Sequence, residues 1–303
     1  MQLPFHTLDV FTTERFGGNA LAVVLEADGL TPSRMQMIAR EFNISETVFV
    51  LKASSPGHSA RVRIFTPGAE VPFAGHPTVG AAALLAGLRT QGGDGERDAI
   101  VVLEQEIGVV RVGVRLKPRQ AAFAEFDAPR LAVSDGEPAH IDQLAAALDL
   151  SPSDIGFESH RPMRYQAGNG FALVPIATLA AIGRARVVAH HWSAALGGGN
   201  IIGAYLYTRQ TVGVGAAFHA RMFAPAVGIA EDPATGSAAV CLAAAIHRFD
   251  KPADGLRRCV IEQGYEMGRP SLIELALDIR RGELASARIG GHAVRVMSGV
   301  IEV

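Results

Sequence analysis

The sequence predicts a mixed α/β (α+β) fold of two similar domains, each a barrel-like, mostly antiparallel sheet around a central helix. Three observations lead to this fold class. Short phrases of the first half recur in the second, segments with strand-like alternation outnumber amphipathic helices, and each half carries one helical segment without a charged residue. Two similar domains that face each other would leave a cleft between them, where we expect the active site.

The clearest repeat joins the phrase Gly75 to Ala82 (GHPTVGAA) with the phrase Glu231 to Ala239 (EDPATGSAA). Other paired phrases keep the same order, at offsets between 150 and 160 residues. They are Gly18-Asn19-Ala20 with Gly168-Asn169-Gly170, Asn43-Ile44 with Asn200-Ile201, Phe65-Thr66-Pro67 with Phe223-Ala224-Pro225, and Glu106-Ile107-Gly108 with Glu266-Met267-Gly268. A solenoid would repeat over a far shorter period, so the pattern indicates a duplicated domain.

Period-two alternation of apolar and polar residues predicts most of the strands. The predicted strands are Phe5 to Phe11, Ala20 to Leu25, Thr47 to Leu51, Arg61 to Phe65, Ile100 to Leu103, Val109 to Leu116, Phe171 to Val174, Ile201 to Tyr207, Leu272 to Leu277 and Ala293 to Met297. One amphipathic helix is predicted from Pro32 to Phe42 with Thr31 as its cap, because proline is favoured at the first helical position. Its counterpart lies near His190 to Leu196, and Gln91 to Arg97 and Pro118 to Gln120 are predicted turns.

Two segments, Val79 to Leu88 and Gly236 to Ile246, are rich in alanine and contain no charge. A helix that is apolar on all sides must be surrounded by protein, so each is predicted to lie inside the curved sheet of its own domain. Thr78 and Thr235 are the predicted caps, and the unpaired amides that follow a cap suit an anion such as a carboxylate. A single substrate in the cleft would touch both helix ends.

The composition excludes several classes of function. The chain has 303 residues, 49% of them hydrophobic and 19% charged, with a net charge of −2, so it can bury full cores but creates no strong field for nucleic acid or anionic lipid. No run approaches the ~20 apolar residues of a membrane span, and the first residues lack the pattern of a secretory signal. We therefore expect a cytoplasmic protein. The only two cysteines, Cys241 and Cys259, suggest neither a disulfide framework nor a zinc knuckle.

An ordered set of motifs resembles the PhzF-like isomerase family, and the resemblance spans nearly the whole chain. The motifs are Leu8-Asp9-Val10-Phe11, Gly18-Asn19-Ala20, Ser45-Glu46-Thr47-Val48-Phe49-Val50, Arg63-Ile64-Phe65-Thr66-Pro67, Phe73-Ala74-Gly75-His76-Pro77, Arg221-Met222-Phe223, Glu231-Asp232, Thr235-Gly236-Ser237-Ala238-Ala239 and Gly268-Arg269-Pro270-Ser271. The resemblance implies a diaminopimelate-epimerase-like fold, a homodimer and an isomerase that needs no cofactor. The family's founding member isomerises trans-2,3-dihydro-3-hydroxyanthranilate on the route to phenazines. We place the two domains at residues 1–122 and 123–303, with a last strand that can cross back to the first domain.

The resemblance assigns catalytic roles to Glu46, His76 and Asp232. On composition alone Glu46 is an ordinary acid at the start of a strand, His76 a histidine bonded to a loop carbonyl, and Asp232 a helix cap. In the family pattern, the glutamate removes a proton from one substrate carbon and returns it at another. The histidine then binds substrate or relays a proton, and the aspartate contacts a substrate amino or hydroxyl group. The offset places Gly203 opposite Glu46, so the duplicated site is predicted to be chemically one-sided.

Gly75, Gly236 and Ser237 are the predicted substrate-binding residues, because their amides and one hydroxyl would hold the substrate carboxylate. The two glycines serve equally well for close packing alone. Glu231 is interpreted as structural. The roles of Arg221, Gln263 and Arg269 stay open, with an ion pair favoured over carboxylate binding for an arginine.

Other chemistries have little support. The epimerase branch of the fold uses two facing cysteines, but here Ala74 precedes Gly75 and Cys241 lies inside a predicted buried helix. No metal site is predicted, because adjacent His190 and His191 should point apart in a helix and no HExxH motif occurs. The sequence therefore favours an isomerase that moves a proton within a small cyclic or amino-acid-like carboxylate. The alternative is a non-catalytic protein that binds a small ligand or regulates through the same fold.

Overall fold

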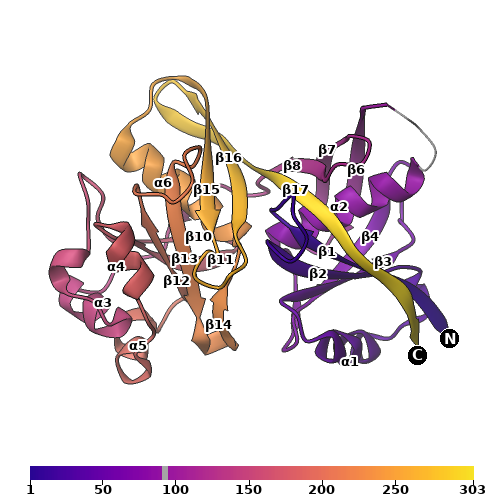
Figure 1. Cartoon of the computed structure of the whole chain (residues 1–303), viewed down its shortest axis with the longest axis horizontal. Helices are drawn as coiled ribbons and strands as arrows, with labels where there is room; N and C mark the ends of the chain where they lie inside the picture. The colour runs from indigo at the N-terminus through magenta and orange to yellow at the C-terminus, as the bar shows by residue number, and fades with distance from the viewer. Residues whose placement is uncertain (91–94) are drawn as a thin grey trace. The chain divides into compact units, whose positions relative to one another are not determined.

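The computed structural model describes residues 1–90 and 95–303 and divides the chain into two compact units. Unit 1 consists of residues 1–129 and 290–303, and unit 2 of residues 130–289. The units therefore meet in the sequence seven residues after the boundary proposed above. The last strand, Glu283–Glu302, begins in unit 2 and continues in unit 1 from residue 290. The amino group of Met1 donates a hydrogen bond to the carbonyl oxygen of Val303 over 2.7 Å, so these two residues lie together in unit 1 (Figure 1).

The strands of unit 1 form a closed barrel. Each pairs with the next in the order β1, β2, β3, β4, β6, β7, β8 and β17, and β17 pairs with β1 again. The two pairs β2–β3 and β4–β6 are parallel. The bounds are β1 Gln2–Val10, β2 Asn19–Val24, β3 Glu46–Leu51, β4 Ala60–Phe65, β5 Glu70–Val71, β6 Arg97–Gln105, β7 Gly108–Leu116, β8 Ala122–Asp127 and β17 Glu283–Glu302. Closure leaves the barrel without an open sheet edge.

Helix α2 (Gly75–Arg89) lies inside this barrel and contacts β1, β2, β3, β6, β7 and β8. Its buried residues are nearly all small or apolar, which confirms the prediction of an enclosed helix. Gly80 allows the closest approach, since a Cβ there would lie 2.5 Å from Leu21 Cδ2 and 2.8 Å from Val10 Cγ2. The helix begins earlier than predicted, so Thr78 lies in its first turn and is not its cap; the cap position belongs to Ala74.

The outer face of unit 1 is covered by α1 (Pro32–Phe42), which has the bounds predicted from the sequence. Thr31 caps it by accepting a hydrogen bond from the Arg34 amide over 3.3 Å. Met35 and Ile38 on its inner side pack with Phe49 and Phe65 of the sheet. A single 3-10 turn, η1 (Ala27–Gly29), precedes it.

Unit 2 repeats the plan of unit 1. Its strands are β9 Val133–Ser134, β10 Met163–Ala167, β11 Asn169–Pro175, β12 Ile201–Thr208, β13 Phe218–Ala224, β14 Ile229–Asp232, β15 Gly255–Gln263 and β16 Ser271–Arg280. The parallel pairs β11–β12 and β13–β15 correspond to β2–β3 and β4–β6 of unit 1. Helix α6 (Gly236–Asp250) contacts β10, β11 and β16 and is buried along most of its length. The predicted duplication is confirmed.

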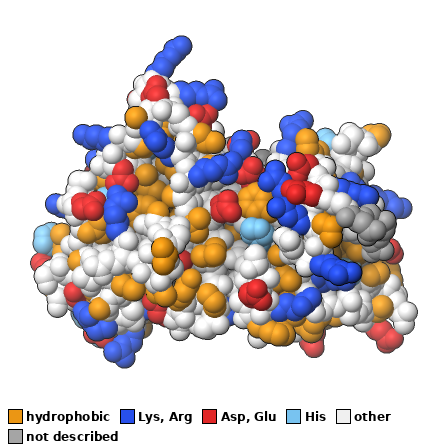
Figure 2. Space-filling model, turned by 45° about the horizontal axis from the view of Figure 1, so that its top comes forward, with side chains coloured by type: hydrophobic (Ala, Val, Ile, Leu, Met, Phe, Trp, Pro, Cys, Tyr) orange, Lys and Arg blue, Asp and Glu red, His pale blue; other side chains and the backbone are white. Residues whose placement is uncertain are grey.

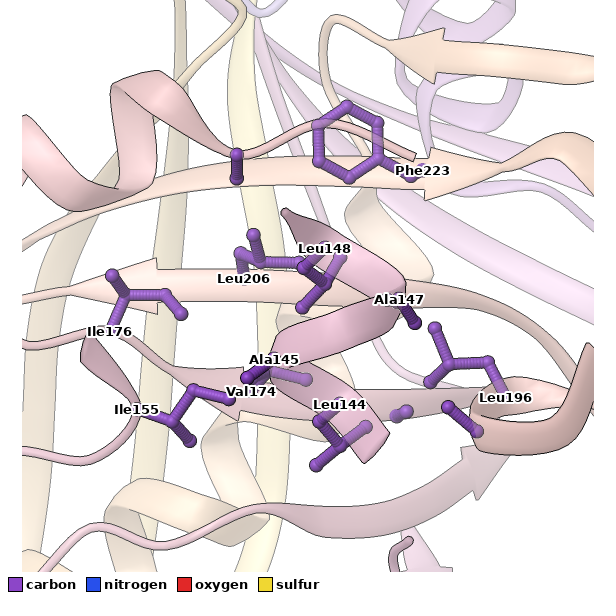
Figure 3. Close-up of a cluster of buried hydrophobic side chains, with 14 of the residues drawn as sticks. Leu144, Ala145, Ala147, Leu148, Ile155, Val174, Ile176, Leu196, Leu206 and Phe223 are labelled. Carbon is purple, nitrogen blue, oxygen red and sulfur yellow. The ribbon is translucent and has the colours of Figure 1, made fainter. Parts of the chain in front are cut away.

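The other face of the unit 2 sheet carries α3 (Ile141–Leu148), α4 (Leu179–Arg184) and α5 (Ala189–Leu196). Figure 3 shows how Leu144 and Leu148 of α3 pack beside Val174 and Leu206 of the sheet. Helix α5 includes the counterpart predicted near His190 to Leu196. Two 3-10 turns, η2 (Pro152–Asp154) and η3 (Pro225–Val227), complete the unit.

The predicted strands all occur with shifts of a few residues, or of more at the ends of the long β17. The sequence does not predict β5, β8, β9, β10, β13, β14 and β15. The predicted turn at Pro118 to Gln120 is present. Of the predicted turn at Gln91 to Arg97, residues 91–94 lie outside the described residues, and Arg97 already begins β6.

Within the described residues no helix has the length and apolarity that a bilayer crossing requires. On the face drawn in Figure 2, acidic and basic side chains are interspersed. This mixture agrees with the net charge of −2.

Candidate active site

Glu46 is the first residue of β3, just after the left-handed Asn43 that ends α1. It pairs in register with Leu21 on the parallel neighbour β2. Only 14% of its side chain is exposed, so the carboxyl group is largely shielded from bulk water. A short loop therefore places this acid at the edge of the barrel, beside the end of the central helix.

His76 lies in the first turn of α2 and is 4% exposed. Its Nε2 is 3.3 Å from Glu46 Oε2, which is within ion-pair range. Burial lowers the pKa of His76 to about 3, against a smaller opposing effect of a hydrogen bond to the Ala20 backbone. The imidazole is therefore neutral at pH 7, and unit 1 brings together the first two predicted site residues.

The equivalent position in unit 2 is Gly203, as predicted. Glu46 pairs with Leu21 between parallel strands, and Gly203 pairs with Phe171 in the corresponding strand pair of unit 2. A Cβ at Gly203 would lie 2.4 Å from the carbonyl oxygen of Phe223. No side chain fits there without a shift of the backbone, so the acid of unit 1 has no counterpart in unit 2.

The α2 terminus also carries Gly75, one of the predicted substrate-binding residues. The helix starts at Gly75, so the amides of Gly75 and His76 have no carbonyl partner one turn earlier within the helix. Pro77 contributes no N–H. The Thr78 hydroxyl donates a 2.8 Å hydrogen bond to the Ala74 carbonyl oxygen, which closes the first turn.

In unit 2, β14 ends at Asp232 and α6 begins at Gly236, followed by Ser237. Thr235 occupies the cap position, as predicted, but its hydroxyl makes no capping bond to the helix. It donates to Asp232 Oδ2 over 2.5 Å instead. Asp232 is 7% exposed, and the fully buried side chain of Gln263 contacts the same segment. The second set of predicted residues thus lies around the start of α6. Gln263, whose role the sequence leaves open, lies there too.

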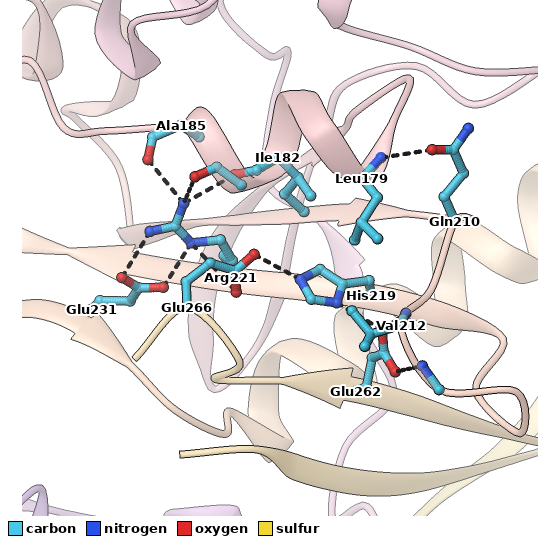
Figure 4. A network of polar contacts seen from close by, with 12 residues as sticks. Leu179, Ile182, Ala185, Gln210, Val212, His219, Arg221, Glu231, Glu262 and Glu266 are labelled. Atoms are coloured by element: carbon cyan, nitrogen blue, oxygen red, sulfur yellow. Dashed lines mark hydrogen bonds and ion pairs between the residues drawn. The ribbon is translucent and has the colours of Figure 1, made fainter. Parts of the chain in front are cut away.

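A second polar network lies behind this helix end in unit 2 (Figure 4). Arg221 forms a bidentate pair with Glu231 at 2.8 and 2.9 Å and donates to the carbonyl oxygens of Ile182 and Ala185 at the end of α4. Its 7% exposure leaves little room for a substrate carboxylate. Arg221 is therefore in an ion pair, as favoured above, and Glu231 is its structural partner.

His219 belongs to the same network and bridges two carboxylates. Nδ1 is 2.8 Å from Glu262 and Nε2 is 2.9 Å from Glu266. Burial lowers the pKa of His219, but the hydrogen bonds to Glu266 and Glu262 outweigh it, so the pKa is raised. The two carboxylates therefore favour the charged form of the imidazole.

The two thiols are unsuited to proton transfer. Cys241 is fully buried in α6, where burial raises its pKa far above the usual value. Burial raises the pKa of Cys259 to about 12.

The rings of His190 and His191 do not point apart as expected, since their centroids are 4.0 Å apart. Across residues 1–90 and 95–303, no three side chains of the ligand types His, Cys, Asp and Glu form a group that could hold a metal ion.

Comparison with known proteins places the chain in a family. The family model for phenazine biosynthesis-like proteins matches residues 8–299. An uncharacterized isomerase of Mesorhizobium japonicum is 51% identical over 294 residues, which are 96% of each chain. A trans-2,3-dihydro-3-hydroxyanthranilate isomerase of Pseudomonas chlororaphis is 34% identical over 97% of each chain. The crystal structure of a PhzF-family phenazine biosynthesis protein of Bacillus anthracis superposes with a TM-score of 0.89 at 25% identity over 100% of both chains.

A barrel around a central helix in unit 1, a second unit built on the same plan, an acid beside a neutral imidazole and relatives named isomerases define an enzyme of the isomerase class. The chain belongs to the PhzF, or phenazine biosynthesis-like, family.

Proposed function

We propose that the protein is a cofactor-independent isomerase in which Glu46 carries a proton between two carbons of a small cyclic or amino-acid-like carboxylate. The observation that supports this most directly is the largely shielded Glu46 carboxyl group 3.3 Å from the neutral imidazole of His76. A charged imidazolium at this distance would lower the pKa of the carboxyl group and weaken it as a base, whereas a neutral imidazole does not. Compounds resembling trans-2,3-dihydro-3-hydroxyanthranilate are the first candidates, since a relative of that name is 34% identical.

The proposed reaction balances without a co-reactant. Glu46 removes a proton from one carbon, and the electron pair of that C–H bond moves into a double bond. The existing double bond then shifts, and a second carbon takes the same proton back from Glu46. Nothing is oxidised or reduced, and the carboxyl group returns to its starting form.

His76 is the proposed partner of Glu46 during the time it holds the proton. The ring is neutral, and it makes a hydrogen bond to the backbone of Ala20. Nε2, which has no other hydrogen-bond partner, is then free to accept a bond from the protonated Glu46. Catalytic hydrogen bonds commonly shorten when the substrate is bound, so a 3.3 Å separation suits this role.

The substrate carboxylate is proposed to bind at the helix ends. The first-turn amides at Gly75 in unit 1 and at Gly236 and Ser237 in unit 2 point along their helix axes, and helix N-termini favour anions. Asp232 is proposed to accept a hydrogen bond from a substrate amino or hydroxyl group. A cytoplasmic homodimer is part of this proposal.

The test is proton exchange in heavy water. Wild-type protein incubated in D2O with trans-2,3-dihydro-3-hydroxyanthranilate, and with a panel of small cyclic and amino-acid carboxylates, is expected to yield deuterated or isomerised product detected by mass spectrometry and ultraviolet spectra. Glu46→Gln should reduce the rate by at least about a hundredfold, because general acid–base catalysis contributes that much or more.

Glu41→Gln is the matched control, since Glu41 is an exposed acid of the same unit at the end of α1, and this variant should keep the wild-type rate. A Glu46→Gln variant as active as wild type would refute the role of Glu46. A ligand from the panel that binds tightly without exchange in the wild type would instead favour the non-catalytic binding protein.

A further inference from the structure

A buried glutamine contacts a threonine at the start of each central helix: the cap residue Thr235 of α6 and the first-turn residue Thr78 of α2. Gln263, at the end of β15, is fully buried, and its Nε2 is 3.0 Å from Thr235 Oγ1. Gln105, at the end of β6, is 9% exposed, and its Nε2 is 3.0 Å from Thr78 Oγ1. The glutamines are 158 residues apart (263 − 105) and the threonines 157 (235 − 78). The pair therefore belongs to the duplicated scaffold.

The chemistry of the amide fixes the direction of each hydrogen bond. An amide nitrogen only donates, so each threonine oxygen is the acceptor and must direct its own proton elsewhere. In unit 2 the Thr235 hydroxyl proton goes to Asp232 Oδ2 over 2.5 Å. In unit 1 the Thr78 hydroxyl proton goes to the Ala74 carbonyl oxygen over 2.8 Å. The threonine hydroxyl thus donates to a side-chain carboxylate in unit 2 and to a backbone carbonyl in unit 1.

Gln263 makes two further bonds that Gln105 does not make. Its second N–H donates to the Asp232 carbonyl oxygen over 2.7 Å, and its Oε1 accepts from the Thr235 amide over 3.2 Å. In unit 1 the Gln105 Oε1 has no hydrogen-bond partner among the described residues. Gln263 therefore holds both ends of the segment from Asp232 to Thr235, together with the hydroxyl that contacts the carboxylate.

The turn after Gln263 is packed against the same segment. Gly264 has φ 78°, and a Cβ at this position would lie 2.7 Å from the Pro233 carbonyl oxygen and 2.5 Å from that of Arg269. Only glycine allows the end of β15 to come this close. The backbone and the side chain at the strand end thus fix the Asp232 segment together.

We infer that Gln263 is a positioning residue of the proposed reaction, because it orients the Thr235 hydroxyl toward Asp232 and so fixes where the Asp232 carboxylate faces the substrate. This inference rests on the proposed function. Gln105 is the structural copy, which steadies the start of α2 without contact to a reacting group.

The test uses isosteric variants in kinetic assays of the isomerisation. Gln263→Glu keeps the acceptor for the Thr235 amide but replaces the donating Nε2, so the Thr235 hydroxyl no longer has to point at Asp232. We expect kcat to fall at least about tenfold, since a small misplacement of an orienting group costs up to about a hundredfold. Gln105→Glu, which buries the same new charge at the matching position, should keep kcat within about threefold of wild type on the same scale.

A double-mutant cycle separates positioning from general loss of structure. Thr235→Ser keeps the hydroxyl and should keep kcat, whereas Thr235→Val should lower it as much as Gln263→Glu does. In a Thr235→Val background, Gln263→Glu should lower kcat by less than about a further twofold. Both changes remove the same chain of hydrogen bonds, from Gln263 through the Thr235 hydroxyl to Asp232. Additive losses, or a wild-type kcat in Gln263→Glu, would overturn the inference. Gln263→Met replaces Gln263→Glu if the latter does not fold.

A readout independent of activity keeps this result apart from the fate of the proposed function. Gln263→Met removes the acceptor of the Thr235 amide, so hydrogen exchange of that amide should speed up at least about tenfold, as expected when a local bond is lost. Gln105→Met should leave the Thr235 amide unchanged. Unchanged exchange in Gln263→Met would overturn the arrangement itself, whereas an inactive wild type with faster exchange in this variant would refute only the proposed function.

Discussion

At the residue scale, the pair of Glu46 and His76 shows how burial selects a protonation state. The imidazole in its first helical turn has almost no contact with water, and its nearest acid is 3.3 Å away. Desolvation dominates, so the pKa falls to about 3 and the ring stays neutral. A neutral ring suits a proton relay, but it makes the folded state sensitive to acid.

His76 is therefore expected to destabilise the protein below pH 6.5. Its folded pKa of about 3 lies below the ordinary value of 6.5, so between these values the unfolded chain binds the proton and the folded chain does not. Stability must fall as the pH drops through this window, by up to about 1.4 kcal/mol per pH unit for one proton. Urea unfolding of wild type and His76→Asn at pH 7, 5.5 and 4.5 measures the slope, which should be shallower in the variant.

His191→Asn, at an exposed histidine, is the control, and its free energy of unfolding should change with pH as steeply as that of the wild type. Equal slopes for wild type and His76→Asn would show that His76 takes up a proton freely in the folded state.

Single residues differ in how far the sequence determines them. The offset between repeats was enough to pair Glu46 with Gly203, because strand register is inherited with the duplication. The proximity of His76 to Glu46 was implied only by the family resemblance. The contacts of Gln105 and Gln263 could not be predicted, because hydrogen-bond direction depends on which groups the fold places around a buried amide. Their similar spacing from the paired threonines, 27 and 28 residues, was the one signal available.

At the element scale, α2 combines two glycines with opposite surroundings. A Cβ at Gly80 would collide with Leu21 and Val10 of the barrel wall, whereas a Cβ at Gly87 would meet nothing within 4 Å. Both positions are helical, so alanine gains the same backbone entropy at each. The difference between them isolates the packing of the helix against the sheet.

Gly87→Ala is expected to stabilise the protein by up to about 1 kcal/mol, the difference in helix propensity. Gly80→Ala should destabilise it by about 1–3 kcal/mol, because overpacking of a close-packed core outweighs that gain. Chemical denaturation of both variants measures the free energies of unfolding. A Gly80→Ala variant as stable as Gly87→Ala would show that the barrel wall yields without cost.

The predictions of elements failed where local signals are ambiguous. Strand β13 is buried at every position, so its sequence has no alternation to detect. The threonine before an apolar run predicts Thr78 as a cap, but Ala74, with its extended backbone, occupies the cap position four residues earlier. Helix α1 was located correctly because its cap, first-turn proline and amphipathic face agree.

At the scale of the whole molecule, the two units respond to pH in opposite directions. Unit 1 buries the neutral His76, and unit 2 buries the charged His219. The raised pKa of His219 contributes stability that is complete below pH 6.5 and is lost as the pH rises through the folded value. Burial alone would raise the pKa of Glu266, but the hydrogen bond to His219 lowers it, so its contribution is complete above pH 4.5.

Unit 2 is thus expected to be most stable between pH 4.5 and 6.5 and to weaken toward pH 9 through His219. The single tryptophan, Trp192, is buried in unit 2, so its fluorescence reports the unfolding of this unit. The wild-type unfolding midpoint in urea should fall between pH 6 and pH 9, whereas that of His219→Gln should change less. Equal changes in both proteins would contradict the charged state assigned to His219.

The strand β17 has a consequence for synthesis on the ribosome. It pairs with β1 and β8 and closes the unit 1 barrel with the last residues of the chain, although β1 is made first. Residues 130–289 complete unit 2 before residues 290–303 are translated. The unit 1 barrel therefore cannot close until residues 290–303 are made, and β1 and β8 each keep an unpaired edge until then. The nascent chain is most exposed to mispairing and to chaperones during that interval.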